Sequence, residues 1–255
     1  MHDAPHPGSN DAEHSVSLII PTFGARPFIL KTLERLAQYA ETTPALKEVI
    51  LIDDGSRDGT SETINQFLAT HPGPCLKFTS LDQNVGKGSA IKKGIHLASG
   101  DIIIFTDCDL PYTFSNIDAF TTILRDGHAD VAIGSRMHPE SIYHIRSNSL
   151  AYIHTRHTLG RIFNFFINCL TRLNIADTQA GLKGFTREAA NLCFGKMTVS
   201  GFAFDIDLLV CAKQNMCRIE ILPLTFTGDS EVSTVHFLKH TILMPANILQ
   251  IVFKN

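Results

Sequence analysis

Short apolar runs alternate with segments of helical periodicity through the first half of the chain. The apolar runs, rich in β-branched and aromatic residues, predict strands at 16–20, 48–52, 76–80, 102–105 and 131–134. Apolar residues at helical spacing predict helices at 28–39, at 61–68, from after Gly88 to Leu97, and at 115–124, the last with Ser115 as its cap. Strands and helices in this order, with short connections, are typical of right-handed βαβ units. The pattern therefore predicts an α/β fold with a mostly parallel central sheet flanked by helices.

The second half of the chain is less regular. Residues 150–173 have a helical pattern, and residues 217–222 form a short apolar run that predicts a strand. Between them, residues 177–185 hold two glycines, which indicate a turn. Residues 202–212 form a hydrophobic run that carries Asp205 and Asp207, so at least one of these acids should be paired or functional.

Two acids end the most apolar of the predicted strands. Asp107 and Asp109 follow residues 102–105 after a single threonine. Because ligands bind outside the carboxyl ends of parallel strands, both acids should border a crevice. Such a pair suits Mg²⁺ or Mn²⁺, which in turn would neutralise a diphosphate. Taken alone, the spacing fits solvated loop acids or a helix cap equally well.

Other polar residues follow predicted strands in the same way. Asp53 and Asp54 come directly after residues 48–52 and could accept hydrogen bonds from a base or from ribose hydroxyls. The alternative is a turn followed by a helix cap. Lys87 lies between two glycines before a helix, where a phosphate could bind. A solvated lysine fits that position equally well.

The second half supplies further candidates. Arg136 directly follows a strand end, so it could hold a phosphate in a bidentate contact. Asp177 and Gln179 stand near a glycine turn, where they could contact a sugar. Other cations that could meet phosphate are Arg156, Arg161 and Lys183. The histidines at 138, 144, 154 and 157 lack a metal-binding spacing.

Composition narrows the class of protein. The chain has 255 residues, enough for one domain with a sizeable core, and a net charge of -3 that gives no reason to expect nucleic acid. Its six cysteines form no CxxC pair, and residues 1–14 lack the features of a signal peptide, so we expect a disordered lead and a cytoplasmic protein. No run of 18 apolar residues predicts a membrane span. The GxGxxG and GxxxxGK[ST] patterns are absent too, so any nucleotide is held in another way.

Seven short motifs occur in a distinctive order. They are IIPTF at 19–23, LIDDGS at 51–56, NVGKGSAI at 84–91, FTDCD at 105–109, GSR at 134–136, DTQAGLKGF at 177–185 and GFAFDIDLL at 201–209. In this order they resemble family 2 glycosyltransferases, above all the branch of dolichyl-phosphate mannose synthases and polyprenyl-phosphate glucosyltransferases. The resemblance implies a GT-A fold over residues 15–232. It also implies inverting transfer of a hexose from a UDP- or GDP-linked sugar to a polyprenyl phosphate.

The resemblance also implies roles for individual residues. The nucleotide sugar would be bound by Pro21, Thr22, Phe23, Asp53, Asp54, Lys87, Asp107, Asp177, Gln179 and Lys183. Asp107 and Asp109 would hold the Mg²⁺ or Mn²⁺ ion. The acceptor phosphate would meet Arg136, Arg161 and a loop at 228–233 that ends in Ser233, so Asp109, Arg136 and Arg161 would be catalytic. A phosphate monoester is already an anion near neutral pH, so it can attack without a general base, and catalysis would consist of positioning and charge neutralisation.

Some features leave alternatives open. Arg26 stands near the position where the family usually has an acid that contacts the base, and Pro111 stands where mannose synthases often have a further metal ligand. Both residues weaken the assignment of GDP-mannose as the donor. The amphipathic segment 233–255 could lie on a membrane surface or pack on the core or a second copy. A second hypothesis for the function is transfer to a soluble sugar or polysaccharide, with Asp205 or Asp207 as general base. A third is a protein that binds a nucleotide sugar without catalytic activity.

Overall fold

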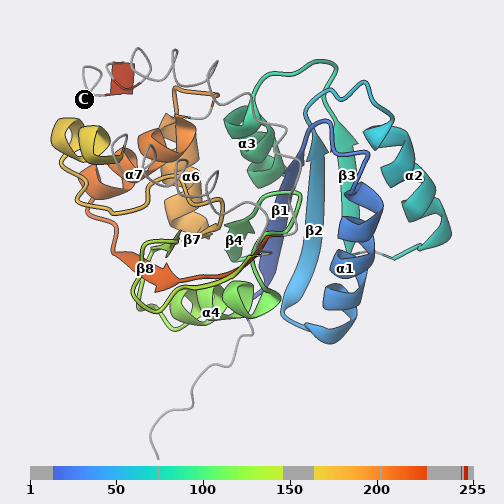
Figure 1. Cartoon of the computed structure of the whole chain (residues 1–255), viewed down its shortest axis with the longest axis horizontal. Coiled ribbons are helices and arrows are strands. Elements are labelled where there is room, and N and C mark those ends of the chain that lie inside the picture. Colours follow the sequence, from blue (N-terminus) through green and yellow to red (C-terminus); the bar gives the residue numbers. More distant parts are fainter. Residues whose placement is uncertain are drawn as a thin grey trace, which may run out of the picture.

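A seven-stranded mixed sheet forms the centre of the protein (Figure 1). The computed structural model describes residues 14–73, 75–145, 164–201 and 203–228, together with positions 248, 250 and 251. Along the sheet, the order is β3 (Leu76–Ser80), β2 (Leu46–Asp53), β1 (Val16–Thr22), β4 (Ile102–Phe105), β7 (Lys183–Thr186), β5 (Val131–Ser135) and β8 (Ile219–Pro223). Strand β7 alone among these runs antiparallel to its neighbours. A second, two-stranded sheet pairs β6 (Ile142–Ile145) with β9 (Thr225–Gly228).

Helices cover both faces of the sheet. One face packs against α1 (Ile29–Thr42), α2 (Thr60–Thr70) and α4 (Phe114–Arg125). The other packs against α3 (Lys87–Leu97), α6 (Arg187–Lys196) and α7 (Phe204–Gln214) (Figure 1). Residues 164–171 are also helical. The predicted α/β fold with helices on a mostly parallel sheet is confirmed.

The sequence of β1 explains its central place. All seven of its residues are buried, with Ile19 in one core and its neighbours Leu18 and Ile20 in the other. A proline is unusual in a central strand because it lacks an N–H donor. Pro21 is tolerated because the ladder with β4 already ends at Ile19, and beyond it Pro21 aligns only with β2.

Several local predictions were wrong or incomplete. Helix α4 begins at Phe114 with Thr113 as its N-cap residue, so Ser115 is inside the helix and not its cap. Strand β7 lies at the end of a segment expected to be a turn, and helices α6 and α7 were not predicted as helices. Of residues 150–173, only 164–173 are described, and they are helical as far as 171.

The expected lead and tail lie largely outside the described residues. Within 233–255, Ile248 and Ile251 are described, and both are buried in the core that also contains α6 and α7. This observation favours packing on the core for that part of the tail.

Candidate active site

The carboxyl ends of the parallel strands and the amino end of β7 meet at one edge of the sheet. Because β7 is antiparallel, Lys183 at its start aligns with Phe105 at the end of β4. The loop that leads into β7 therefore lies beside the turn that follows β4. Ligands of parallel α/β sheets bind at this edge. Candidates from both halves of the sequence are thus brought together in one place.

The ends of β1 and β2 form the first part of this edge. Thr22 and Asp53 are aligned partners in neighbouring strands. Asp53 is buried, and its carboxylate accepts hydrogen bonds from the Ser56 hydroxyl at 2.5 Å and from the Ser61 hydroxyl. Phe23 is 51% exposed directly beyond the strand. An aromatic ring is therefore available to a ligand here, while Asp53 is engaged within its own loop.

Asp54 fixes the loop before α3. Its two carboxylate oxygens accept hydrogen bonds from the backbone N–H groups of Val85 and Gly86, at 2.8 and 2.9 Å. Burial raises the pKa of Asp54, and the two hydrogen bonds oppose that shift. Lys87 begins α3 immediately after this loop. Asp54 therefore positions Lys87, and its own contact with a nucleotide sugar stays a prediction.

Asp107 and Asp109 lie on the turn after β4. The Lys87 ammonium donates to Asp107 Oδ1 at 2.5 Å, and the Asp107 side chain is 36% exposed. Burial would raise the pKa of Asp107, but the charge and hydrogen bond of Lys87, together with the charges of Lys183 and Arg136, hold that pKa below its usual range. Asp109 is exposed. The turn thus carries a half-buried carboxylate that contacts Lys87 and an exposed carboxylate, Asp109.

Helix α1 supports this turn. The Thr32 hydroxyl donates to the carbonyl of Cys108 at 2.8 Å, and the Arg35 guanidinium donates to the carbonyl of Leu110 at 3.3 Å. Leu110 has a φ of 46°, a left-handed conformation that costs an L-residue about 1–2 kcal/mol. Contacts with α1 therefore hold a strained backbone in the shape that presents the two acids.

The acid pair fits a divalent ion that is shared with a ligand. Within the described ranges, no group of three or more His, Cys, Asp or Glu side chains could hold a metal. Magnesium is commonly held by one or two carboxylates together with substrate phosphates. Asp107 already holds a cation, the Lys87 ammonium, and Gly181 leaves it space: a Cβ at Gly181 would lie 1.9 Å from Asp107 Oδ2. Asp107 and Asp109 therefore suit Mg²⁺ or Mn²⁺ when phosphate oxygens complete the coordination.

Lys183 is completely buried below this turn. Its ammonium donates to Asp205 Oδ1 at 2.6 Å and to the carbonyl of Ala180 at 2.6 Å. Desolvation lowers the pKa of Lys183 and raises the pKa of Asp205, while their mutual attraction opposes both shifts. The ion pair joins α7 to the start of β7, and the contact with Ala180 ties Lys183 to the loop before this strand. Lys183 here supports the site from inside, and its contact with the donor stays a prediction.

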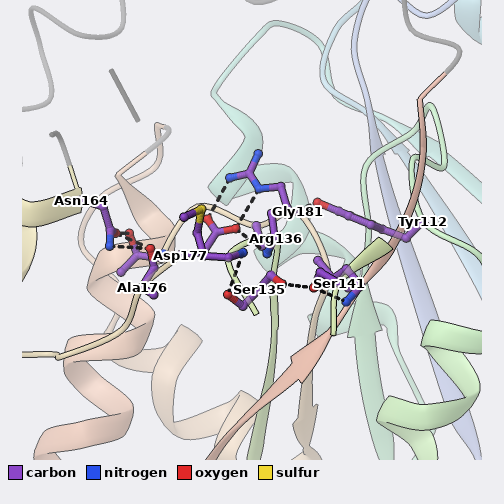
Figure 2. Close-up of polar contacts among 12 residues, drawn as sticks. Tyr112, Ser135, Arg136, Ser141, Asn164, Ala176, Asp177 and Gly181 are labelled. Atoms are coloured by element: carbon purple, nitrogen blue, oxygen red, sulfur yellow. Dashed lines mark hydrogen bonds and ion pairs between the residues drawn. The ribbon is translucent and has the colours of Figure 1, made fainter. Parts of the chain in front are cut away.

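Arg136 and Asp177 form a bidentate pair at the end of β5 (Figure 2). Arg136 Nε and Nη2 donate to the two oxygens of Asp177, each at 2.8 Å, and the Arg136 backbone N–H donates at 2.9 Å. Burial would raise the pKa of Asp177, but its hydrogen bonds to Arg136 hold that pKa below its usual range. The Asp177 side chain is 7% exposed and that of Arg136 30%. Asp177 thus fixes a guanidinium that can still meet an anion.

Two residues that were not expected from the sequence hold the loop around Asp177. Asn164 donates from Nδ2 to the carbonyls of Ile175 and Ala176, both at 2.8 Å. The Tyr112 hydroxyl accepts from the Gly181 backbone N–H at 3.3 Å, and Figure 2 shows Tyr112 on the far side of Arg136 from Asn164. No short motif marks either residue: Asn164 contacts residues 11 and 12 positions away, and Tyr112 contacts a residue 69 positions away.

The remaining candidates differ in what the structure shows. Gln179 Nε2 is buried and has no hydrogen-bond partner in the part of the chain that the structure describes. Such an amide is uncommon and is compatible with a ligand oxygen. Arg161 and Ser233 lie outside the described residues, as does Arg156.

The two acids proposed as bases for a sugar acceptor are both engaged. Asp205 is paired with Lys183. Asp207 Oδ2 accepts from the Thr198 backbone N–H at 2.6 Å, from the Thr198 hydroxyl at 3.0 Å and from the Val199 N–H at 3.2 Å. Asp207 therefore fixes the segment between α6 and α7.

Comparison with known proteins supports the same interpretation. The model of the family described as "Glycosyl transferase family 2" matches residues 17–194. The chain belongs to this family. It is 32% identical to the human dolichyl-phosphate beta-glucosyltransferase over 78% of this chain and 63% of the relative. It is 28% identical to the enzyme of that name from Trichomonas vaginalis, over 91% of this chain and 70% of the relative. The chain thus spans about two thirds of the length of these relatives.

Solved structures share the fold at lower identity. Glucosyl-3-phosphoglycerate synthase from Mycobacterium tuberculosis, in complex with UDP, has a TM-score of 0.68 at 17% identity, over 98% of this chain and 86% of that chain. A mannosyltransferase from Pyrobaculum calidifontis, in complex with GDP-mannose and Mn²⁺, has a TM-score of 0.58 at 17% identity, over 93% of this chain and 64% of that chain. These likenesses confirm the predicted GT-A fold.

Proposed function

We propose that this protein is an inverting hexosyltransferase that moves a sugar from a nucleoside diphosphate to a polyprenyl phosphate, with Mg²⁺ or Mn²⁺ as cofactor. The observation that carries the proposal is the fixed Arg136 guanidinium, held by Asp177 near the acids that follow β4. A guanidinium fork matches the geometry of phosphate. The names of the relatives, dolichyl-phosphate beta-glucosyltransferases, support this acceptor.

UDP-glucose is the donor that we propose. The named relatives are glucosyltransferases, and the synthase from Mycobacterium tuberculosis was crystallised with UDP-glucose and Mn²⁺. The exposed ring of Phe23 offers a surface on which the base could stack. Pro111, in place of a possible metal ligand, agrees with a donor other than GDP-mannose.

The residues of the chain can divide the chemistry between them. A bound metal would neutralise the charge of the departing diphosphate. Arg136 would hold the acceptor phosphate as it attacks the anomeric carbon, and Gln179 could donate its buried amide hydrogen to the donor. No proton needs to be removed, because the attacking phosphate is already ionised. This agrees with Asp205 and Asp207 both being occupied by structural contacts.

The acceptor is a membrane lipid, and we propose that the protein works at a membrane surface. Among the described residues, no helix combines the length and the apolar character that a bilayer span requires. The helix at 164–171 exposes Phe165, Phe166 and Leu170 by 64%, 58% and 49%. Its residue Asn164 also holds the loop of Asp177. An apolar face so close to the proposed phosphate site supports peripheral contact with the membrane.

A partition assay tests the proposal. Radiolabelled UDP-glucose, Mn²⁺ and detergent-solubilised dolichyl phosphate should give a labelled product that extracts into organic solvent. Arg136→Ala should raise the acceptor KM while UDP binding is kept. Arg125→Ala, which changes an exposed arginine paired with its neighbour Asp126, is the matched control and should behave as wild type. Label that appears only in water-soluble sugars would refute the lipid acceptor.

A further inference from the structure

The contact between Lys87 and Asp107 places an ammonium on one of the two proposed metal ligands. Lys87 Nζ lies 2.5 Å from Asp107 Oδ1 and 5.8 Å from the centre of the Phe204 ring. The Lys87 side chain is only 19% exposed. Asp54 fixes the backbone just before Lys87, so this lysine is held in place and is not a mobile surface residue. An internal cation therefore occupies one carboxylate oxygen of a proposed metal ligand.

The surrounding charges are nearly balanced. Four acids and three bases interact electrostatically here, which gives a formal charge of -1 for the set Asp107, Asp109, Asp177, Asp205, Lys87, Arg136 and Lys183. A divalent ion alone would reverse the sign of this charge. A divalent ion that arrives with the two negative charges of a sugar diphosphate would leave it unchanged. The set thus favours the complex of metal and diphosphate over the metal alone.

We propose that Lys87 competes with the metal for Asp107 and makes metal binding depend on the nucleoside diphosphate. In the unliganded protein the Lys87 ammonium neutralises Asp107 and weakens the binding of a metal ion to it. When metal and diphosphate bind together, the ammonium passes from Asp107 to the diphosphate, and Asp107 becomes available to the metal. This inference rests on the proposed function, because it assumes that Asp107 and Asp109 bind a metal with a nucleotide.

Coupling of this kind must be reciprocal. If the diphosphate strengthens metal binding, the metal strengthens diphosphate binding by the same factor. Lys87 acts through Asp107, so it is a positioning residue toward the metal. Removing Lys87 should therefore change how strongly the nucleotide increases metal affinity. Removing a purely structural lysine would leave that increase unchanged.

The test is Mn²⁺ binding, measured by the electron paramagnetic resonance of unbound Mn²⁺, with and without UDP. The wild-type protein should bind Mn²⁺ weakly alone and on the order of tenfold more tightly, or better, with UDP. Lys87→Met should bind Mn²⁺ alone on the order of tenfold more tightly than wild type, with a smaller gain from UDP. Lys87→Arg keeps the charge and should behave more like wild type. Lys93→Met changes an exposed lysine of the same helix and is the matched control.

The Mn²⁺ titrations distinguish failure of the role proposed for Lys87 from failure of the proposed metal site. If UDP strengthens Mn²⁺ binding to the wild type but Lys87→Met binds Mn²⁺ alone no better, the role of Lys87 is refuted and the proposed function stands. If Lys93→Met gains as much as Lys87→Met, the effect is one of general charge and the proposal is also refuted. If the wild type binds no Mn²⁺ even with UDP, both the metal site and the competition fail. Circular dichroism and thermal melts confirm that each variant is folded.

Discussion

Replacing Asp177 by asparagine tests how Arg136 is held. The substitution keeps the shape of the side chain but removes its charge and one of its two acceptor oxygens. Arg136 makes three hydrogen bonds to Asp177, at 2.8, 2.8 and 2.9 Å, and the asparagine amide could accept only part of them. A hydrogen bond to a charged group contributes about 1.5–3 kcal/mol. Because Arg136 is partly exposed to water, which screens the pair, we expect a net loss of about 2 kcal/mol in the free energy of unfolding.

The functional effect should fall on the acceptor. A guanidinium that can rotate away from the phosphate should lower kcat/KM for the polyprenyl phosphate on the order of 100-fold. Asp177→Asn should change UDP affinity little, because Asp177 binds Arg136 and does not contact the donor in this proposal. Steady-state kinetics with varied acceptor, together with calorimetric titration of UDP and Mn²⁺, separate the two effects.

A second ion pair of the same form provides the control. Asp130 accepts hydrogen bonds from the backbone N–H, Nε and Nη2 of Arg218, the same three donor groups that Arg136 offers to Asp177. The Arg218 side chain is 59% exposed, and Arg218 lies directly before β8, at the amino ends of the parallel strands and so away from the proposed site. Asp130→Asn should therefore leave acceptor kinetics unchanged.

A strong effect of Asp177→Asn on donor binding would show a different role for Asp177. If Asp177→Asn weakens the binding of UDP-glucose as strongly as it impairs the use of acceptor, Asp177 contacts the donor sugar, as the resemblance implied. The positioning of Arg136 would then not be its main function.

Three further changes probe other parts of the structure. The pKa of buried Glu48 is lowered from 4.5 to about 2: burial alone would raise it, but hydrogen bonds outweigh burial, that of Lys77 most. The Glu48 carboxylate therefore contributes about 2–3 kcal/mol to the free energy of unfolding above pH 4.5, and this contribution is lost as the pH falls toward 2. In urea unfolding between pH 6 and pH 3, Glu48→Gln should make stability depend less on pH. An unchanged pH dependence would show that other groups cause it. Gly181→Ala puts a Cβ 1.9 Å from Asp107 Oδ2, so Mn²⁺ and UDP binding should fall in a folded protein; binding equal to wild type would show that the loop moves aside. Asp207→Asn should lower the melting temperature but spare turnover per folded molecule, and a selective loss of turnover would make Asp207 catalytic.

The first half of the fold could be predicted because its signals are local. Strands such as Ile102–Phe105 are continuous apolar runs, and the polar residues after them mark the carboxyl edge of the sheet. Strand β7 could not be predicted in this way. It has four residues, one of them glycine, and it is stabilised by pairing with β4 and β5, which are distant in sequence. The insertion of an antiparallel strand is thus decided by tertiary contacts.

The site shows the same division. Asp107 and Arg136 lie just after strands, so their location at one edge could be expected. The side-chain pairs could not be expected, because their members are distant in sequence. Asp177 lies 41 residues from Arg136, Lys87 lies 20 residues from Asp107, and the buried ion pair joins Lys183 to Asp205 across 22 residues, so no spacing rule connects any of these pairs. Helix α7 was also missed, because all its residues from Phe204 to Ala212 are buried and it therefore lacks the amphipathic pattern that reveals a surface helix.

The most direct measurement is the anomeric configuration of the product. The protein is incubated with UDP-α-glucose, Mn²⁺ and dolichyl phosphate, and the lipid-linked product is analysed by NMR. We expect a β-linked glucosyl phosphate, formed by wild type and absent with Asp109→Ala. A product in which glucose is attached to a sugar hydroxyl, or an α-linked glucosyl phosphate, would contradict it.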